Sequence, residues 1–283
     1  ALILPWEFGA IPKAWLRSLR ADEFWVPSKF VRDVLVRAGI ASERVAVIPN
    51  GFDPTLYRPD GEKFKPDAAR AVNFLFAGGA IARKGVDVLL EAWKEAFSPG
   101  DDVSLTVKDL GSKTFYRHLS LADEITQLAS SGTAAPIIYL ADEWSELRLP
   151  LLYRGSDVIV LPYRGEGFGL PLLEGLACGK PVIATGAGPA PEFCPPDATW
   201  FVPAEEVEVP AALRPPGEMT GPLTWFEPDR KALATALRAA YEEARRGRMA
   251  HRAAAAEAVR HTHTWTRVAP RYIERVGNLG GSQ

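Results

Sequence analysis

Short apolar runs rich in β-branched residues alternate with segments of helical periodicity across residues 71–202, and this alternation leaves few possible folds. A loop containing glycine or proline separates most neighbouring segments, an order that predicts a parallel sheet flanked by helices. The expected strands are Val72–Ala77, Val103–Lys108, Pro136–Leu140, Asp157–Pro162, Pro181–Thr185 and Thr199–Val202. The expected helices are Val86–Phe97, Leu119–Ala129, Trp144–Arg154 and Leu170–Cys178. Together they predict a doubly wound α/β domain.

The first fifty residues read as about two smaller αβ units. The expected elements are a helical pattern at Trp6–Arg20, a strand at Glu23–Val26, a helix opened by Ser28 and closed by Gly39, and a strand at Arg44–Ile48. Turn-forming residues follow at 49–51, so we place a boundary there and divide the chain into residues 1–52, 53–248 and 249–283. Fifty residues bury too little surface to form a stable domain alone.

The last third of the chain begins with a proline-rich stretch, Pro203–Pro222, which carries an acidic cluster at Glu205, Glu206 and Glu208 and reads as an extended surface insertion. Helices are expected after it at about Asp229–Arg246, Met249–His261 and Thr264–Val276. The last of these ends before a Gly-Gly tail.

Charge and cysteine usage exclude several classes of function. Lysine and arginine number 33 against 35 acidic residues, so the basic surplus typical of nucleic-acid binding is absent and no nucleic-acid partner is expected. Cys178 and Cys194 lack zinc spacing, and His261 and His263 do not share a helix face, so no metal site is expected. The cysteine usage fits a reducing compartment, and no run is long enough to span a membrane. We expect a cytoplasmic protein, with peripheral membrane contact left open.

The loop 163–169 follows a predicted strand and precedes a helix, which places it where open α/β sheets bind ligands. Pro171 suits the first helical turn, so the N–H groups near Gly169 and Leu170 should form a positive end that accepts a phosphate. Glu166 and Glu174 could flank a small polar ligand and accept hydrogen bonds from its hydroxyl groups, which a sugar supplies. Taken alone, Glu166 is better explained as a solvated turn residue and Glu174 as a first-turn acid that complements the helix dipole.

A second glycine-containing loop, residues 78–85, also follows a strand and opens a helix. Arg83 offers a planar fork and Lys84 a point charge, and together with the helix start they suit a diphosphate. A solvated Arg-Lys pair is the alternative. Residues 108–111 end the next strand on the same side, where Leu110 could contact a base through its backbone or simply form a turn.

These loops together strongly resemble the donor half of the retaining GT-B glycosyltransferases of family 4, also described as group 1. The resemblance rests on Glu166 and Glu174 as an E-x7-E motif within residues 156–185, on Val26-Pro27-Ser28, on residues 48–53 and on Arg83-Lys84-Gly85. It implies two Rossmann-like units, the first only partly present, and makes residues 249–283 the helices that cross back to it.

The resemblance also implies a reaction, in which a sugar passes from a UDP- or GDP-sugar to an unknown glycan, lipid or small molecule with retention of configuration. No metal or other cofactor is required. The implied contacts are Glu166, Gly167 and Phe168 with the donor sugar, Glu174 with the ribose, and Gly169, Leu170, Lys84 and Arg83 with the diphosphate. Many members carry their phosphate arginine where this chain has Gly79. Glu166, Lys84 and Arg83 are the candidate catalytic residues, and Glu192 ranks below the motif glutamates.

The resemblance leaves the acceptor half without a counterpart, and several readings stay open. A second chain or self-association could complete the site, which predicts exposed apolar surface at Trp6, Trp15 or Trp25, although each could equally be a core residue. The alternative to an enzyme is a partner-dependent, non-catalytic nucleotide-sugar binding subunit. A GT-B-type epimerase is disfavoured because its acidic and histidine residues are not recognisable.

Overall fold

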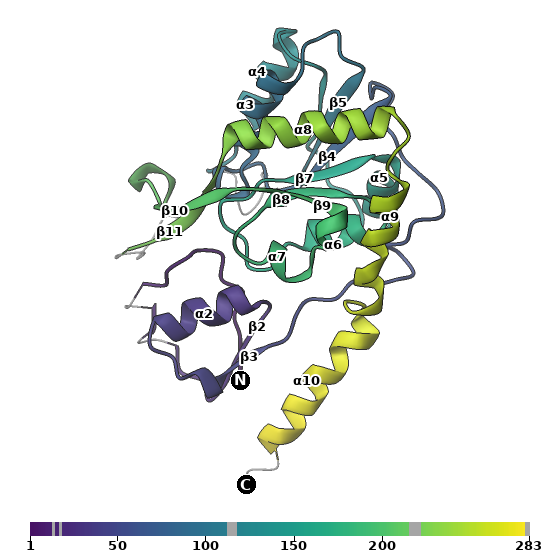
Figure 1. Cartoon of the computed structure of the whole chain (residues 1–283). Helices are drawn as coiled ribbons and strands as arrows, with labels where there is room; N and C mark the ends of the chain where they lie inside the picture. Colours follow the sequence, from purple (N-terminus) through teal and green to yellow (C-terminus); the bar gives the residue numbers. More distant parts are fainter. Residues whose placement is uncertain (13–14, 17–18, 112–117, 215–221, 281–283) are drawn as a thin grey trace.

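The computed structural model describes residues 1–12, 15–16, 19–111, 118–214 and 222–280, with side chains described up to Asn278. Its centre is a six-stranded parallel sheet in the order β6-β5-β4-β7-β8-β9 (Figure 1). The strands are β4 (Val72–Gly78), β5 (Val103–Asp109), β6 (Ile137–Leu140), β7 (Val158–Leu161), β8 (Val182–Thr185) and β9 (Thr199–Val202). All six predicted strands are therefore present, within about a residue of their predicted ends.

Helices cover both faces of this sheet, which confirms the doubly wound α/β prediction. Helices α3 (Val86–Ala96) and α8 (Arg230–Arg245) pack together on one face, while α5 (Leu149–Gly155) and α6 (Leu170–Ala177) lie on the other (Figure 1). The strand order reverses between β4 and β7, because β5 and β6 continue on one side and β8 and β9 on the other. A ligand crevice is expected at such a switch point, outside the carboxyl ends of the strands.

Two helices start later than the sequence pattern suggested. Helix α4 covers Ala122–Ser131, and α5 begins at Leu149 rather than at Trp144, with a proline in its first turn. The Trp144 ring instead packs edge-on against Phe64 at 5.3 Å, and the Arg148 guanidinium lies 3.9 Å above its centroid. A long-range aromatic contact therefore replaces the first predicted helical turn.

The N-terminal part forms a separate three-stranded parallel sheet in the order β1-β2-β3. Its elements are β1 (Leu2–Ile3), β2 (Phe24–Val26), α2 (Lys29–Arg37) and β3 (Val45–Val47). Ser28 caps α2 as predicted, accepting a hydrogen bond from the Val31 N–H at 3.2 Å.

The predicted helix Trp6–Arg20 is wrong over residues 6–12, which are non-helical; residues 13–14 and 17–18 lie outside the described part. The Gly9 N–H donates to the Thr224 carbonyl at 2.7 Å, so this stretch runs beside a distant segment. Its aromatic residues face that segment, and this tertiary packing outweighs the local helical pattern.

The predicted surface insertion contains an antiparallel hairpin of β10 (Ala204–Glu208) and β11 (Thr224–Pro228), with residues 215–221 outside the described part. The hairpin is not merely a surface feature. Buried residues at its base form one cluster with the N-terminal stretch: Trp6, Phe8 and Ile11 on one side and Val209, Leu223 and Trp225 on the other. The hairpin thus joins the two halves of the molecule.

The C-terminal helices cross between the two halves. They are α9 (Ala250–Ala256), a 3-10 helix at Glu257–His261, and α10 (Trp265–Gly280). Between β8 and β9 the chain forms α7 (Ala190–Phe193) and a 3-10 turn at Pro196–Ala198. Val268 and Tyr272 of α10 pack against Trp25 of β2. None of the described helices is both long and apolar enough to cross a bilayer.

The exposed apolar surface is not where the tryptophans suggested. Trp6 is 4% and Trp25 6% exposed, so the expectation of exposure is wrong for both, and Trp15 is half-buried. Exposed large apolar side chains are found instead on β1 and α10 (Ile3, Trp265, Ile273 and Val276) and at three leucines elsewhere (Leu147, Leu170 and Leu213).

Candidate functional site

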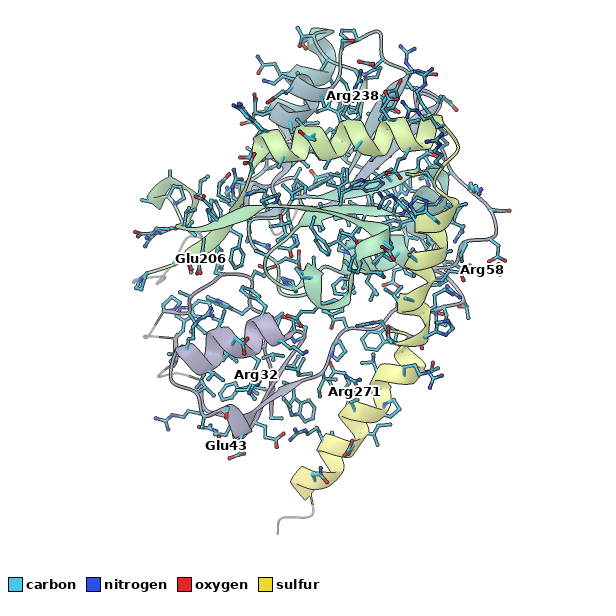
Figure 2. The ribbon with its side chains drawn as sticks, viewed as in Figure 1. Arg32, Glu43, Arg58, Glu206, Arg238 and Arg271 are labelled. Atoms are coloured by element: carbon cyan, nitrogen blue, oxygen red, sulfur yellow. The ribbon has the colours of Figure 1, made fainter. Side chains whose placement is uncertain are left out.

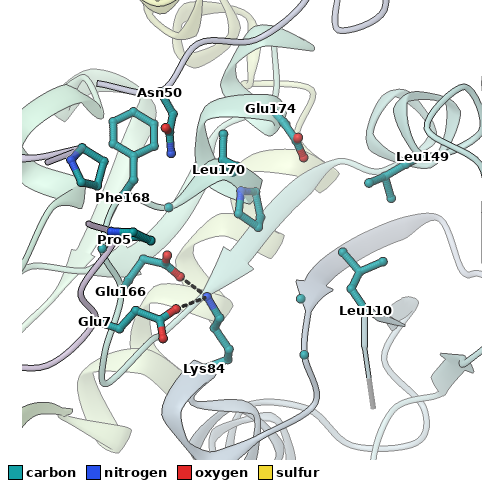
Figure 3. Close-up of a pocket in the computed structure, with 16 residues that line it drawn as sticks. Pro5, Glu7, Asn50, Lys84, Leu110, Leu149, Glu166, Phe168, Leu170 and Glu174 are labelled. Carbon is teal, nitrogen blue, oxygen red and sulfur yellow. Dashed lines mark hydrogen bonds and ion pairs between the residues drawn. The ribbon is translucent and has the colours of Figure 1, made fainter. Parts of the chain in front are cut away.

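A pocket of about 390 Å³ opens at the switch point, between the carboxyl ends of β4 and β7 and the N-terminal part (Figure 3). Nine of the ten predicted site residues line it: Gly79, Lys84, Leu110, Glu166, Gly167, Phe168, Gly169, Leu170 and Glu174. Arg83 does not line it. The N-terminal part contributes Pro5, Glu7, Pro27 and Asn50, which the sequence did not indicate.

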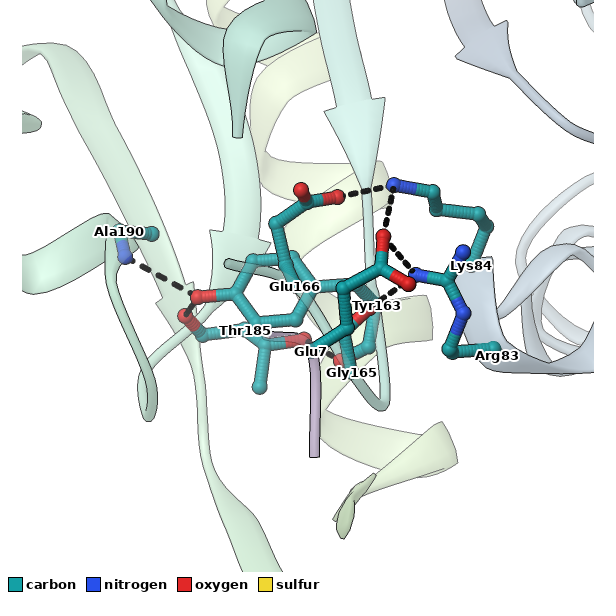
Figure 4. Close-up of polar contacts among 8 residues, drawn as sticks. All are labelled: Glu7, Arg83, Lys84, Tyr163, Gly165, Glu166, Thr185 and Ala190. Atoms are coloured by element: carbon teal, nitrogen blue, oxygen red, sulfur yellow. Dashed lines mark hydrogen bonds and ion pairs between the residues drawn. The ribbon is translucent and has the colours of Figure 1, made fainter. Parts of the chain in front are cut away.

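The loop after β7, residues 162–169, is held in place by its own polar side chains; we call it the donor loop. The Tyr163 hydroxyl donates to the Ala187 carbonyl at 2.6 Å and accepts from the Ala190 N–H at 3.1 Å (Figure 4). Thr185 donates to the Tyr163 carbonyl at 2.6 Å. Burial raises the pKa of Tyr163 well above its ordinary value, so the hydroxyl stays protonated as these bonds require.

Arg164 ties the donor loop to α3 and to the hairpin. Its buried guanidinium donates to Asp87 at 2.7 Å and to Glu227 at 2.6 and 2.8 Å, and it lies 5.0 Å from the Trp225 ring centroid. This arginine points away from the pocket and acts in support of the loop. A loop fixed in this way can hold ligand contacts in a constant geometry.

Gly169 ends the donor loop and opens α6. Its φ of 99° places it in the left-handed region, where glycine is favoured, and its carbonyl accepts from the Leu172 and Leu173 N–H groups. Gly169, Leu170 and Pro171 all line the pocket. The positive end of the α6 dipole therefore faces the cavity and suits an anion.

The loop after β4, residues 78–85, brings Lys84 to the opposite wall; we call it the phosphate loop. The Asp109 carboxylate accepts from the Ala80 N–H at 3.1 Å and from the Tyr139 hydroxyl at 2.6 Å, which joins this loop to the end of β5. Gly85 turns the chain into α3 with a φ of 74°. A side chain here would meet the Pro162 carbonyl oxygen at 1.8 Å, so only glycine fits.

Four charged side chains meet beside the pocket (Figure 4). Lys84 donates to Glu166, and its Nζ lies 3.9 Å from Glu7. The Arg83 Nη1 lies 2.7 Å from Glu7 and donates to the Gly165 carbonyl at 2.9 Å. These four side chains carry two positive and two negative charges, and Glu7 reaches both cations from the N-terminal part.

The two carboxyl groups of this cluster respond differently to their surroundings. Burial acts to raise the pKa of Glu166, but Lys84 and Arg83 outweigh it and hold that pKa below its ordinary value. Burial dominates at Glu7 and raises its pKa, although Arg83 and Lys84 oppose the change. The surroundings therefore favour the ionised form of Glu166, whereas at Glu7 burial favours the neutral form and the two cations oppose it.

Glu174 lies apart from this cluster, near the Tyr57 and Tyr153 hydroxyl groups; the first-turn position expected for it is wrong, because α6 begins at Leu170 and Glu174 belongs to its second turn. Burial raises the pKa of Glu174 to about 7, against the opposing influence of the two tyrosines. No cation adds to the causes of this shift. Its carboxylate is thus available as an acceptor for ligand hydroxyl groups at neutral and higher pH.

Two glycines of the donor loop serve a purpose that we did not predict. A side chain at Gly165 would meet the Glu7 carbonyl oxygen at 2.4 Å, and one at Gly167 would meet the Trp6 carbonyl oxygen at 2.9 Å. These glycines therefore admit the N-terminal segment, not only a ligand. Because the contact joins residues about 160 positions apart, no local pattern in the sequence announces it.

Polar contacts beside the pocket also hold α2 to the rest of the molecule. The Ser28 hydroxyl donates to the Gly167 carbonyl at 2.8 Å, and Glu192 accepts from the Lys29 and Phe30 N–H groups at 2.8 and 2.7 Å. Glu192 thus caps α2 and does not line the pocket. Among the described residues, no group of His, Cys, Asp and Glu is arranged to hold a metal ion.

Comparisons with known proteins show which sequences and folds this chain is similar to. The family model described as glycosyl transferases group 1 matches residues 71–213, and the model described as glycosyltransferase family 4 matches residues 2–56. The D-inositol 3-phosphate glycosyltransferase of Rhodococcus opacus is 38% identical over 166 residues, which cover 55% of this chain and 36% of that protein. The MMP alpha-(1->4)-mannosyltransferase of Mycolicibacterium hassiacum is 27% identical over 192 residues, which cover 66% of this chain and 43% of that protein. The aligned part thus spans well under half the length of these relatives.

Solved structures share the fold. A glycosyltransferase from Rickettsia africae superposes with a TM-score of 0.71 at 18% identity, covering 98% of this chain and 70% of that one. Anabaena Alr3699/HepE in complex with UDP and glucose gives a TM-score of 0.67 at 19% identity, and the match covers 94% of this chain and 67% of that one. At these identities the likeness concerns the arrangement of strands and helices.

Proposed function

Because the chain belongs to the group 1 glycosyl transferase family, whose model matches residues 71–213, we propose that it transfers a sugar from a nucleoside-diphosphate donor. The acceptor is a hydroxyl group of a glycan, lipid or small molecule, and the anomeric configuration is retained. The donor is a UDP- or GDP-sugar, and no metal is required. These details go beyond what family membership shows, and the chemistry of the pocket residues is the support for them.

The diphosphate lies between the phosphate loop and the start of α6. Lys84 contributes a positive charge from one wall, and the Gly169 and Leu170 backbone contributes N–H groups at the positive end of a helix from the other. The site is partly closed from water, which strengthens such interactions. The same groups stabilise the negative charge that develops as the diphosphate leaves.

The two motif glutamates bind different parts of the donor, the ribose and the transferred sugar. Glu174 accepts the ribose hydroxyl groups, and Glu166 with the Gly167 and Phe168 backbone contacts the donor sugar. Leu110 and Gly79 lie at the ends of β5 and β4, where the backbone can contact the base. Charge supports this division, because the ionised Glu166 is paired with the diphosphate lysine while Glu174 stands apart from it.

In the proposed reaction, the bond between the anomeric carbon and the diphosphate oxygen breaks, and a bond to the acceptor oxygen forms on the same face of the sugar. The acceptor proton passes to the departing diphosphate oxygen, so charge and atoms balance without another reactant. Lys84 is the candidate catalytic cation. Arg83 has a supporting part, because it lies outside the pocket lining and holds Glu7.

The single observation that carries the proposal is one pocket, at the sheet's switch point, lined by nine predicted residues. Calorimetric titration of UDP, GDP and ADP into wild type and Glu174→Ala tests it. We expect one nucleotide to bind and the substitution to weaken binding about tenfold, as the loss of a hydrogen bond to a charged group would. Glu274→Ala, on the exposed side of α10, is the matched control and should bind like wild type. If no nucleotide binds, the assignment is wrong.

A partner-dependent binding subunit is the second candidate, and the exposed apolar residues favour it. Ile3 is 60% and Ile273 71% exposed, and a partner chain that covered them would bury this apolar surface. One structural neighbour is itself described as a GtfA/B complex, with a TM-score of 0.62 at 16% identity. Donor hydrolysis and transfer by the purified chain, followed by product chromatography, separate the candidates. Transfer by the lone monomer would exclude the subunit reading.

A further inference from the structure

We propose that Glu7, supplied by the N-terminal segment, is a specificity-determining residue that makes the pocket prefer a sugar-linked diphosphate over the free nucleoside diphosphate. The inference rests on the proposed function and deepens it. Glu7 was not among the residues that the sequence indicated. Its assignment comes from the contacts that place its carboxylate between Arg83 and Lys84, the lysine that also pairs with Glu166.

The backbone of Glu7 is fixed from two sides. Its carbonyl lies so close to Gly165 that a side chain there would approach it to 2.4 Å, and two residues later the Gly9 N–H donates to Thr224 of the hairpin at 2.7 Å. The flanking Trp6 and Phe8 are 4% and 5% exposed. Glu7 therefore cannot leave the site by a movement of the chain, and only its side chain can turn.

Arg83 fixes the direction of that side chain. Its guanidinium is 9% exposed, lies 2.7 Å from the Glu7 carboxylate and is braced by the Gly165 carbonyl at 2.9 Å. Glu7 lines the pocket, but Arg83 does not. The arginine therefore lies behind the glutamate and holds it toward the cavity; Figure 3 shows Glu7 among the lining side chains, and Figure 4 shows its contact with Arg83.

The charge beside the pocket is already balanced, with Arg83 and Lys84 facing Glu7 and Glu166. A free nucleoside diphosphate ends in a phosphate that carries about one more negative charge than a phosphate esterified to a sugar. That charge would fall beside Lys84 and within reach of Glu7. Because the site is partly closed from water, the repulsion is larger than it would be in solution.

The same carboxylate has a favourable role when a sugar is present. Ionised carboxylates only accept hydrogen bonds, and sugar hydroxyl groups donate them. When the diphosphate engages Lys84, Glu7 and Glu166 become acceptors on one side of the sugar. Glu7 thus weakens binding of the free nucleoside diphosphate and strengthens binding of the sugar donor. This difference favours release of the nucleoside diphosphate after transfer.

The test compares the affinities of UDP with UDP-glucose and of GDP with GDP-mannose by calorimetry, in wild type and in Glu7→Gln. The measured quantity is the dissociation constant of the free diphosphate divided by that of its sugar conjugate. We expect Glu7→Gln to lower this ratio roughly three- to tenfold, with tighter binding of the free diphosphate. Glu43→Gln removes the same charge from an exposed site far from the pocket (Figure 2) and should leave the ratio unchanged.

Glu7→Asp is the control for the possibility that Glu7→Gln changes the ratio through a loss of folding. It keeps the charge beside Arg83 but withdraws the carboxylate by one methylene, and it should give an intermediate ratio with an unchanged thermal midpoint. A ratio that stays the same in Glu7→Gln, with nucleotide still bound, overturns this inference and leaves the proposed function standing. No binding of any nucleotide to wild type overturns both.

Discussion

Nucleotide affinity is expected to depend on pH through Glu174. Burial raises the pKa of this carboxyl group to about 7, so it is mainly protonated below neutrality and mainly ionised above it. A ribose hydroxyl group donates far better to a carboxylate than to a neutral acid. Binding should therefore strengthen as pH rises through the pKa, and the nucleotide should in turn lower that pKa.

The magnitude follows from the titration itself. With a pKa of about 7, about one tenth of the molecules carry an ionised Glu174 at pH 6 and about nine tenths at pH 8. If only the ionised form binds the ribose well, affinity rises about tenfold over this interval, equivalent to about 1.4 kcal/mol.

Calorimetric titration at several pH values between 6 and 8 measures the effect, with whichever diphosphate binds wild type. The terminal phosphate of the nucleotide itself titrates near pH 6, so wild type must be compared with Glu174→Gln at each pH. The variant keeps the side-chain shape but cannot ionise. The ratio of the two affinities should grow about tenfold from pH 6 to pH 8. A ratio that stays constant would refute the reasoning, because it would mean that Glu174 does not titrate beside the ligand.

Three further substitutions test the loops around the pocket. In Gly85→Ala, the new side chain would adopt a φ of 74° and approach the Pro162 carbonyl oxygen to 1.8 Å. Urea titrations should show that the free energy of unfolding falls by about 3 kcal/mol or more. A loss below about 1 kcal/mol would contradict the close approach. Ser28→Ala removes the α2 cap and the hydrogen bond to Gly167, with an expected loss of about 1–2 kcal/mol in the same assay, whereas an unchanged midpoint would argue against both bonds. Lys84→Gln should weaken binding of the nucleoside diphosphate at least tenfold in calorimetry, and an unchanged dissociation constant would remove this lysine from the site.

The sheet could be predicted from the sequence because its strands are buried on both faces. Residues 72–78 and 103–109 are buried along their whole length, and such strands read as nearly continuous apolar runs between turns. The loop with Lys84 follows the first of these strands, and the loop with Glu166 follows Val158–Leu161, which is buried in the same way, so both loops could be placed at the ligand side of the sheet. The family resemblance then led us to expect Lys84, Glu166 and Glu174 together. The pocket confirms that they share one cavity.

What the sequence could not indicate depends on contacts between distant segments. The stretch around Trp6 carries a helical pattern, yet its apolar side chains pack against Trp225 and Leu223 of the hairpin instead of lying on one helix face. Glu7 belongs to this stretch, and its partner Arg83 lies 76 positions away. Without the hairpin in place, no local rule orients that carboxylate toward the pocket.

The two crossings between the halves of the molecule act as a joint. At Phe52 and Thr264 the outgoing and returning chains run in parallel, bonded from the Phe52 N–H to the His263 carbonyl at 2.9 Å and from the Trp265 N–H to the Phe52 carbonyl at 3.1 Å. A single connection would leave the halves free to swivel, whereas two bonded connections, together with the hairpin, restrain that rotation. A side chain at Gly51 would press on the Trp265 ring at 2.9 Å. A larger residue at position 51 would therefore push the two crossings apart at this joint.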